Sequence, residues 1–124
     1  MLRLAPLVGL LLIARPLFAQ TAEDAVLGKQ QFGQCRACHT EARGGPDAVG
    51  PNLFGVYGSK AATRRKKFAY SSALKASGVV WNDTSLDRWL SDPAAMVKGT
   101  KMEFIGLPRK VVRQHVIAYL KTLK

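Results

Sequence analysis

Cysteine and histidine are scarce in this chain of 124 residues, which has two of each. A structural zinc site needs about four nitrogen or sulfur ligands. Because His115 falls in a helical C-terminal segment, such a site would lack a ligand. The chain also has no apolar run near the ~20 residues that a membrane span requires. Strand-like alternation, internal repeats and low-complexity tracts are absent as well. These absences disfavour a zinc protein, a permanent membrane anchor and a β fold.

Acidic residues are outnumbered, with 8 Asp and Glu against 19 Lys and Arg and a formal net charge of +11. A balance of this kind favours acidic partners through long-range steering and says little about the fold. Nucleic acid is the usual partner of such a composition, but the export signal described next argues against it. We therefore expect acidic protein surfaces as partners and no nucleic acid.

The first 19 residues resemble a secretory signal. Arg3 precedes an apolar run over residues 7–14, and small residues follow near Ala19. We expect cleavage after Ala19, which leaves residues 20–124 as one domain that is small for a self-sufficient core. Export would place the mature protein in the bacterial periplasm.

The segment Cys35-Arg36-Ala37-Cys38-His39 matches Cys-x-x-Cys-His, the signature for covalent attachment of a c-type haem. Each thiol adds to a vinyl group to form a thioether, and His39 then lies under the iron as an axial nitrogen ligand. A thioredoxin-type dithiol would need a preceding strand and a βαβ pattern, and neither is visible. In bacteria haem is attached on the far side of the membrane, so the motif and the export signal agree.

Met102 is the strongest candidate for the sixth ligand of the iron. It follows the polar residues Gly99-Thr100-Lys101, where an apolar side chain has no periodic neighbour. A thioether is a suitable soft ligand for iron, although core packing is the ordinary role of a methionine. Met96 and His115 are the alternatives, and we expect His115 on a helix face.

The mature chain is expected to be all-α. A first helix is predicted from Thr21, with Asp24 as its capping-box-like partner, through Gly28 and Phe32 to the haem motif. A glycine inside a helix costs about 1 kcal/mol relative to alanine. Close approach of a second helix at Gly28 would explain that cost.

Further helices are predicted at residues 70–77 and from about Thr84, the latter ending before Pro93. The last helix is predicted to start with Pro108 at its first position. Its apolar face recurs at three- and four-residue spacing: Val112, Val116, Tyr119, Leu120 and Leu123. Glycines and prolines over residues 44–58 mark a long loop, which is unusual in a compact domain unless it covers a ligand. Haem is the expected ligand.

A series of motifs resembles class I cytochrome c, the small soluble monohaem type of bacterial and mitochondrial electron-transfer chains. In chain order the motifs are Cys35-x-x-Cys38-His39, Gly50-Pro51-Asn52-Leu53, Phe68-Ala69-Tyr70-Ser71, Trp81, Gly99-Thr100-Lys101-Met102-x-Phe104 and Ile117-Ala118-Tyr119-Leu120. The resemblance implies a class I cytochrome c fold, in which short helices and loops surround one covalent haem and the terminal helices cross. It also implies an electron carrier that shuttles single electrons between exported or membrane-bound redox complexes, not an enzyme.

The resemblance further implies the roles of individual residues at the haem. His39 and Met102 would be the axial ligands, and the Pro51 carbonyl would accept a hydrogen bond from the other ring nitrogen of His39, which orients the ligand. Phe104 would lie against the macrocycle. Near the terminal-helix crossing, Gly28 would meet the last helix.

The polar edges of the haem are assigned in the same way. Tyr70 and Trp81 would donate hydrogen bonds to a propionate, and simple aromatic packing is the alternative for both. Thr100 would lie near the other buried polar edge.

Four residues depart from the usual family pattern. Lys98 stands where the family commonly has proline, so the methionine loop loses a rigid φ. Ser59 replaces a frequent arginine near the propionates, which should lower the reduction potential slightly. Trp89 replaces a frequent tyrosine and Leu74 a frequent asparagine, and the drier pocket should raise the potential.

The basic surface suggests how partners dock. Lysines around the expected haem edge, with Arg36, would face carboxylates of a redox protein: Lys60, Lys98, Lys101 and Lys110. The run Arg64-Arg65-Lys66-Lys67 is either a solvated face or a second contact with an acidic subunit or anionic lipid. We expect a freely diffusing monomer. The alternatives are a haem c subunit of an exported dehydrogenase or oxidoreductase complex, and peroxide chemistry if Met102 does not bind iron.

Overall fold

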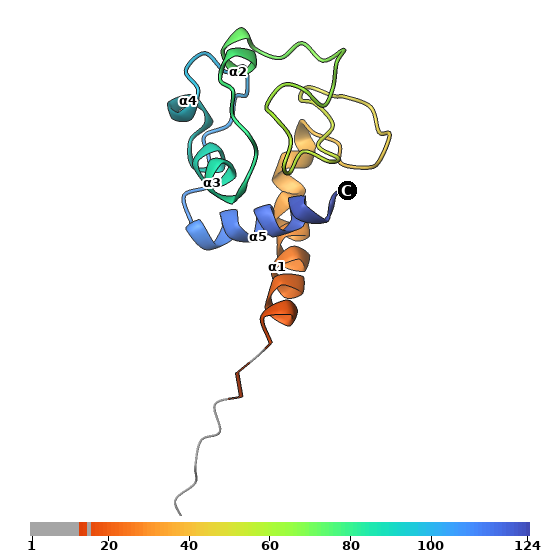
Figure 1. Ribbon diagram of the computed structural model, residues 1–124, viewed down its shortest axis with the longest axis vertical. Coiled ribbons are helices and arrows are strands. Elements are labelled where there is room, and N and C mark those ends of the chain that lie inside the picture. Colours follow the sequence, from red (N-terminus) through yellow and green to blue (C-terminus); the bar gives the residue numbers. More distant parts are fainter. Residues whose placement is uncertain (1–12, 15) are drawn as a thin grey trace, which may run out of the picture.

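The computed structural model describes residues 13–14 and 16–124. The signal expected over residues 1–19 lies for the most part outside this range. Figure 1 shows the helices in chain order, which are α1 (Leu17–Gln31), the 3-10 helix η1 (Phe32–Ala37), α2 (Ser72–Ala76), α3 (Asp83–Ser91), α4 (Pro93–Met96) and α5 (Lys110–Thr122). Within the described residues the only strand-like pairing is an isolated bridge between Lys60 and Val80. The expected all-α fold is therefore confirmed.

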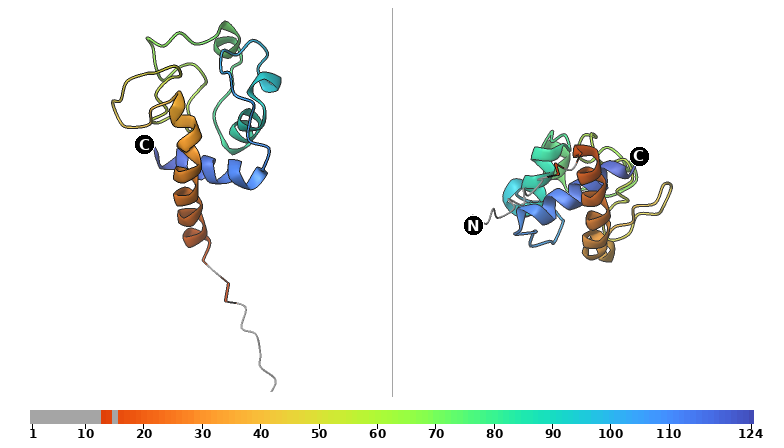
Figure 2. Two further views of the ribbon diagram at one scale, coloured as in Figure 1. Left: turned by 180° about the vertical axis from the view of Figure 1, so that it is seen from behind. Right: turned by 90° about the horizontal axis from the view of Figure 1, so that it is seen from below.

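The two terminal helices cross, as expected, and Figure 2 shows α5 lying across α1 from two directions. Gly28 makes this crossing possible, because a Cβ at this position would overlap the backbone carbonyl of His115 on α5. Beside it, Phe32 and Tyr119 pack edge to face with ring centroids 5.3 Å apart. Val116 of α5, which is 1% exposed, belongs to the same hydrophobic core as Phe32 and Tyr119. Gly28 thus lowers the helix propensity of α1, but its lack of a side chain permits the close approach of the two helices.

Two helices begin earlier than predicted. The helix α1 starts at Leu17, directly after the extended residue Pro16, so Thr21 lies inside the helix and does not cap it. Pro16 is the N-cap residue, with φ −62° and ψ 139°, and no side chain caps this end of the helix. The helix α3 is capped by Asn82, whose side chain accepts from the Ser85 N–H at 2.9 Å, while the Ser85 hydroxyl accepts from the Asn82 N–H at 2.9 Å. This reciprocal capping box overrides the predicted start near Thr84.

The helix α5 begins at Lys110, two residues later than its predicted first residue Pro108. The carbonyls of Leu107 and Pro108 instead accept hydrogen bonds from the buried Arg113 guanidinium, at 2.8 and 3.0 Å. Arg113 also pairs with Asp87 of α3 at 2.8 Å. These bonds fix the segment just before α5 and link α5 to α3.

The short helix α4 was not predicted. The helix α3 ends at Ser91, before Pro93 as expected, but Pro93 then occupies the first position of α4. The Asp92 side chain caps this helix by accepting from the Ala95 N–H at 3.0 Å. A proline that ends one helix can therefore start the next, because the first turn of a helix needs no N–H at that position.

The long loop between η1 and α2 is held in place by the buried side chain of Asn52. Its amide donates to the Thr40 hydroxyl at 2.8 Å and to the Ala42 carbonyl at 3.0 Å. Its backbone N–H donates to Asp47 at 2.8 Å, and Asp47 pairs with Arg65 at 2.7 Å. These hydrogen bonds and this ion pair fix the conformation of the loop at several residues. No helix within the described residues is both long and apolar enough to cross a membrane.

Candidate functional site

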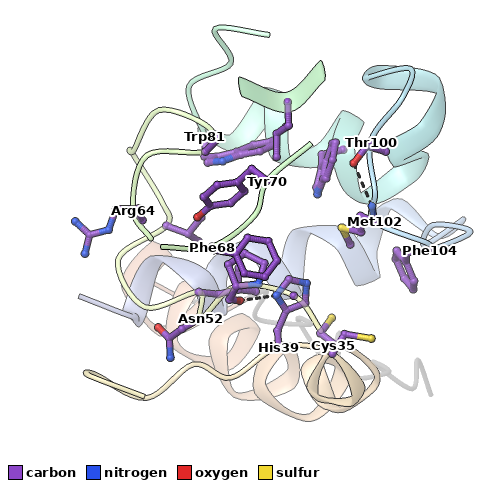
Figure 3. Close-up of a pocket in the computed structure, with 18 of the residues that line it drawn as sticks. Cys35, His39, Asn52, Arg64, Phe68, Tyr70, Trp81, Thr100, Met102 and Phe104 are labelled. Carbon is purple, nitrogen blue, oxygen red and sulfur yellow. Dashed lines mark hydrogen bonds between the residues drawn. The ribbon is translucent and has the colours of Figure 1, made fainter. Parts of the chain in front are cut away.

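The structure contains a cavity of about 660 Å³, within the range of roughly 300–1,000 Å³ that is usual for small-molecule sites. Figure 3 shows that its walls come from segments spread along the whole chain. All of the site residues predicted from the sequence line it: Cys35, Cys38, His39, Pro51, Tyr70, Trp81, Thr100, Met102 and Phe104. The structure therefore brings the predicted site together in one place.

The His39 imidazole is oriented by its own loop. Its Nδ1 donates to the Pro51 carbonyl at 2.7 Å, because a carbonyl can only accept. Burial lowers the pKa of His39, and the Pro51 bond opposes this only in part. The ring is therefore neutral near pH 7 with Nε2 left as its acceptor atom, which is the form that binds a metal. Gly50 lets the ring lie against the backbone, since a Cβ there would be 2.8 Å from both ring nitrogens.

The two cysteines are brought to the cavity by η1, which contains Cys35 and has Cys38 as its C-cap residue. The N–H groups of Cys38 and His39 both donate to the Cys35 carbonyl, at 3.1 and 2.9 Å. Both thiols are free, and Cys38 is the more exposed. Burial raises the pKa of Cys35 to about 11, whereas a reactive redox cysteine has a lowered pKa. This difference disfavours the thioredoxin-type alternative.

Met102 lines the cavity from the loop that precedes α5, far along the sequence from Cys35 and His39 (Figure 3). Its N–H donates to the Thr100 hydroxyl at 3.2 Å, and the Thr100 N–H donates to the Val97 carbonyl at 3.1 Å. The Phe104 N–H donates back to the Met102 carbonyl at 3.1 Å. This chain of local bonds fixes the backbone on both sides of the methionine, so its thioether is held at the cavity wall.

The two alternative ligands are placed elsewhere. Met96 is partly buried and packs against the hydrophobic core, and it does not line the cavity. His115 lies on α5, where Nδ1 is 3.2 Å from the Gln31 side chain and Nε2 is 3.6 Å from Asp24 on α1. The expectation that His115 occupies a helix face is confirmed, and its contacts link the terminal helices.

Tyr70 and Trp81 lie at the end of the cavity away from Met102 and Phe104 (Figure 3). Burial raises the pKa of the Tyr70 phenol, while the Arg65 backbone and the charges of Arg65 and Arg64 oppose that rise. Trp81 is buried and packs on Trp89 with ring centroids 5.2 Å apart. These aromatics form a wall with one polar corner.

Two arginines have roles that the sequence did not indicate. Arg64 is among the residues that line the cavity, although its exposed guanidinium points outward, away from Tyr70 (Figure 3). Arg36, which was expected on the docking face, instead pairs with Glu41 at 2.6 Å and lies over the Phe32 ring at 5.2 Å. Its charge is thereby partly neutralised, which weakens the case for docking.

The comparisons with known proteins agree with this site. The chain is 45% identical over 104 residues to cytochrome c2 of Rhodomicrobium vannielii, which covers 84% of this chain and 82% of that protein. It is 38% identical over 113 residues to cytochrome c2 of Blastochloris viridis, with coverages of 91% and 88%. The structure of cytochrome cH from Methylobacterium extorquens matches with a TM-score of 0.75 and 43% identity, over 80% of this chain and 98% of that one.

No family model matches the chain, so the assignment depends on these relatives. Their identities and coverages are high enough to establish common descent, and the fold agrees along most of the chain. They do not favour the alternative of a subunit of an exported dehydrogenase. The chain therefore belongs to the class I cytochrome c family, whose members are electron-transfer proteins with one covalently bound haem c and are not enzymes.

Proposed function

We propose that this chain is a periplasmic electron carrier in which Cys35 and Cys38 hold the porphyrin and His39 and Met102 are the axial ligands. The observation that carries the proposal is the shared cavity, into which a neutral imidazole and a thioether both project. A haem bound there would supply a one-electron couple at its iron. Apart from the charged and polar groups at its rim, the wall is apolar, which suits a macrocycle.

The residues around the cavity are suited to electron transfer, in which no substrate has to bind. The Pro51 carbonyl fixes the tautomer and the ring orientation of His39, and the Thr100 hydroxyl steadies the Met102 backbone. Core aromatics such as Trp81 and Trp89 exclude water. A methionine ligand raises the reduction potential relative to a second histidine, so we expect the protein to accept electrons from a quinol-oxidising complex or a dehydrogenase. It would pass them to a terminal oxidase or a reductase.

Partner docking would use the cationic rim of the cavity. Lys60 and Lys101 both line the cavity, Lys98 is exposed nearby, and the Lys101 ammonium lies 3.4 Å from the Ala69 carbonyl. Cations around an opening attract carboxylates and raise the association rate at low salt. We therefore propose an acidic docking surface on the partner and a transient complex with a monomeric carrier.

The periplasmic location is the part of the proposal that depends on the N-terminus. Residues 1–19 have the composition of a secretory signal, and the covalent haem motif at Cys35 requires attachment outside the cytoplasm. Expression in a bacterium with cell fractionation and mass measurement of the mature chain would test this. A periplasmic protein that starts at Gln20 is expected, whereas an intact Met1 terminus would contradict cleavage.

The ligand assignment is tested by the optical spectrum of the haem-loaded protein. We expect the spectrum of covalent c-type haem together with the weak far-red band of methionine bound to ferric iron. The band should disappear in Met102→Ala and persist in Met96→Ala, which removes a methionine that packs in the core. Covalent haem without the band in the wild-type protein would refute the proposed ligation and favour ligand binding or peroxide chemistry.

A further inference from the structure

The segment from Met102 to Pro108 leads from the proposed methionine ligand to α5 and contains no helix and no strand. Within the described residues, three hydrogen bonds join its backbone to a helix. The Leu107 N–H donates one of them, to the Leu90 carbonyl of α3 at 2.7 Å. The Arg113 guanidinium donates the other two, to the Leu107 and Pro108 carbonyls at 2.8 and 3.0 Å. One side chain therefore makes most of the hydrogen bonds that hold this segment.

Arg113 is the one charged residue that is buried in the described part of the chain, with 9% of its surface exposed. Burial of a charge is costly unless the charge is paired and hydrogen-bonded. Its Nε donates to Asp87 on α3 at 2.8 Å. Because the donors of a guanidinium form a rigid planar fork, one arginine can bind a carboxylate and backbone carbonyls together. Arg113 thus links both α3 and the methionine segment to α5.

The three elements that meet at Arg113 all line the cavity. Their lining residues are Leu86, Trp89 and Leu90 of α3, Val116 and Leu120 of α5, and Met102, Glu103 and Phe104 of the segment. Arg113 itself does not line the cavity. Its effect on the site is therefore limited to the positions of these elements.

The backbone between Met102 and the Arg113 contacts is short and closely packed. Four residues separate Met102 from Leu107. Within them the Phe104 N–H donates to the Met102 carbonyl at 3.1 Å. Gly106 has a φ of +105°, and a Cβ built on it would overlap the Ser91 carbonyl at the end of α3. A shift of residues 107–108 would therefore move the backbone of Met102 as well.

We propose that Arg113 is a positioning residue that keeps the Met102 thioether on the iron by holding the segment after Met102 against α3 and α5. This inference depends on the proposed function, because it requires Met102 to be an axial ligand. Without the guanidinium, the Leu107 and Pro108 carbonyls lose their shared donor, and the segment moves away from the cavity more often. The form of the protein in which Met102 has left the iron then becomes more populated.

The test is the binding of imidazole to the ferric, haem-loaded protein at one fixed pH. Imidazole reaches the iron only after Met102 has left it, so its apparent affinity is proportional to the population of that form. Arg113→Gln should raise the association constant about tenfold, and Asp87→Asn, which leaves the carbonyl bonds of Arg113 in place, about threefold. Because the Asp87 side chain is 33% exposed, Asp87→Asn keeps the inference testable if Arg113→Gln does not fold.

Arg65→Gln is the matched control. Arg65 also bridges a carboxylate and a backbone carbonyl, since its guanidinium donates to Asp47 at 2.7 Å and to Gly45 at 3.1 Å. These partners lie in the loop between η1 and α2, and Arg65 does not line the cavity. Both arginine variants should therefore lower the midpoint of unfolding by guanidinium chloride, whereas only Arg113→Gln should bind imidazole more tightly.

Two results would each overturn the inference. One is an Arg113→Gln protein that binds imidazole no more tightly than Arg65→Gln, and the other is an Asp87→Asn protein with wild-type affinity. The optical spectrum separates this failure from failure of the proposed function. Absence of the far-red methionine band in the wild-type protein refutes the ligand assignment, while a normal band with unchanged imidazole affinity in Arg113→Gln refutes only the role of Arg113.

Discussion

At the scale of single residues, Lys98 shows how a departure from the family pattern can be understood from the backbone. The Thr100 N–H donates to the Val97 carbonyl at 3.1 Å across a tight turn, and Gly99 has a φ of +90°. These features define a type II turn with Lys98 at its second position, where proline is favoured. Val97 is extended, with φ −130° and ψ 93°, which is the conformation that a following proline requires. The turn therefore keeps the shape of a proline turn without the proline.

We predict that Lys98→Pro stabilises the haem-loaded protein by about 0.4–1 kcal/mol, because proline restricts the unfolded chain at a site whose folded conformation already suits it. Guanidinium unfolding measures the change. Lys98→Ala is the control, since it removes the same exposed charge without the ring and should stay within ~0.5 kcal/mol of the wild type. A proline variant that is less stable than the alanine variant would show that the turn has another geometry.

At the scale of secondary-structure elements, the packing of α1 on α5 depends on Gly28. Gly28 faces the His115 carbonyl, and the Tyr119 Cβ would lie 2.9 Å from a Cβ at residue 28. The nearest obstructing atoms are the backbone carbonyl atoms of His115, and neither they nor the Tyr119 Cβ can move aside by a side-chain rotation. At this crossing the steric cost of a Cβ at residue 28 is therefore expected to exceed the gain in helix propensity.

We predict that Gly28→Ala destabilises the protein by ~1–3 kcal/mol or more, as expected for an overpacked contact, despite the gain of about 1 kcal/mol in helix propensity. The midpoint of guanidinium unfolding reports the change. Gly33→Ala is the matched control, because nothing lies within 4 Å of a Cβ at this residue of η1. Equal midpoints for the two variants would contradict the close crossing.

The helix boundaries were harder to predict than the helices themselves. The helix α3 was predicted to begin near Thr84, but it is capped by Asn82, whose side chain accepts a hydrogen bond from the Ser85 N–H. The start of α1 was obscured because the residues after Pro16 also belong to the expected export signal. Boundaries depend on a few hydrogen bonds, whereas the apolar spacing that predicts a helix extends over several turns.

At the scale of the whole molecule, the cavity residues were predictable where a motif carries their chemistry. The Cys-x-x-Cys-His spacing identifies His39, and the polar surroundings of Met102 separate it from Met96. That Arg64 is among the cavity-lining residues was not predictable, because its position depends on how the loop folds around Gly55, against whose backbone its guanidinium lies. The sequence of a basic run does not indicate which of its residues will line a cavity, because that depends on how the surrounding loop folds.

The same loop sets how the molecule responds to acid. The pKa of Asp47 is lowered, first by the hydrogen bond from the Asn52 N–H and then by Arg65. The pKa of Asp83 is also lowered, first by its bond from Lys121. Because the Asp83 side chain is 63% exposed and that of Asp47 only 24%, solvent screens the Asp83 pair more strongly. Asp47 should therefore dominate the acid sensitivity of this loop.

The sign of the effect follows from the direction of the shift. A carboxyl whose folded pKa lies below its ordinary value of 3.8 binds its proton more readily in the unfolded chain. Its contribution to stability is complete above that ordinary value and is lost as the pH falls through the lower folded value. Asp47→Asn removes the charge at every pH, so it should lower the Tm at pH 7 and lose this effect as the pH falls through the lowered folded pKa of Asp47. Thermal unfolding of both proteins across this range measures the gap in Tm, and a gap that stays constant with pH would mean that the Asp47 charge does not hold the loop.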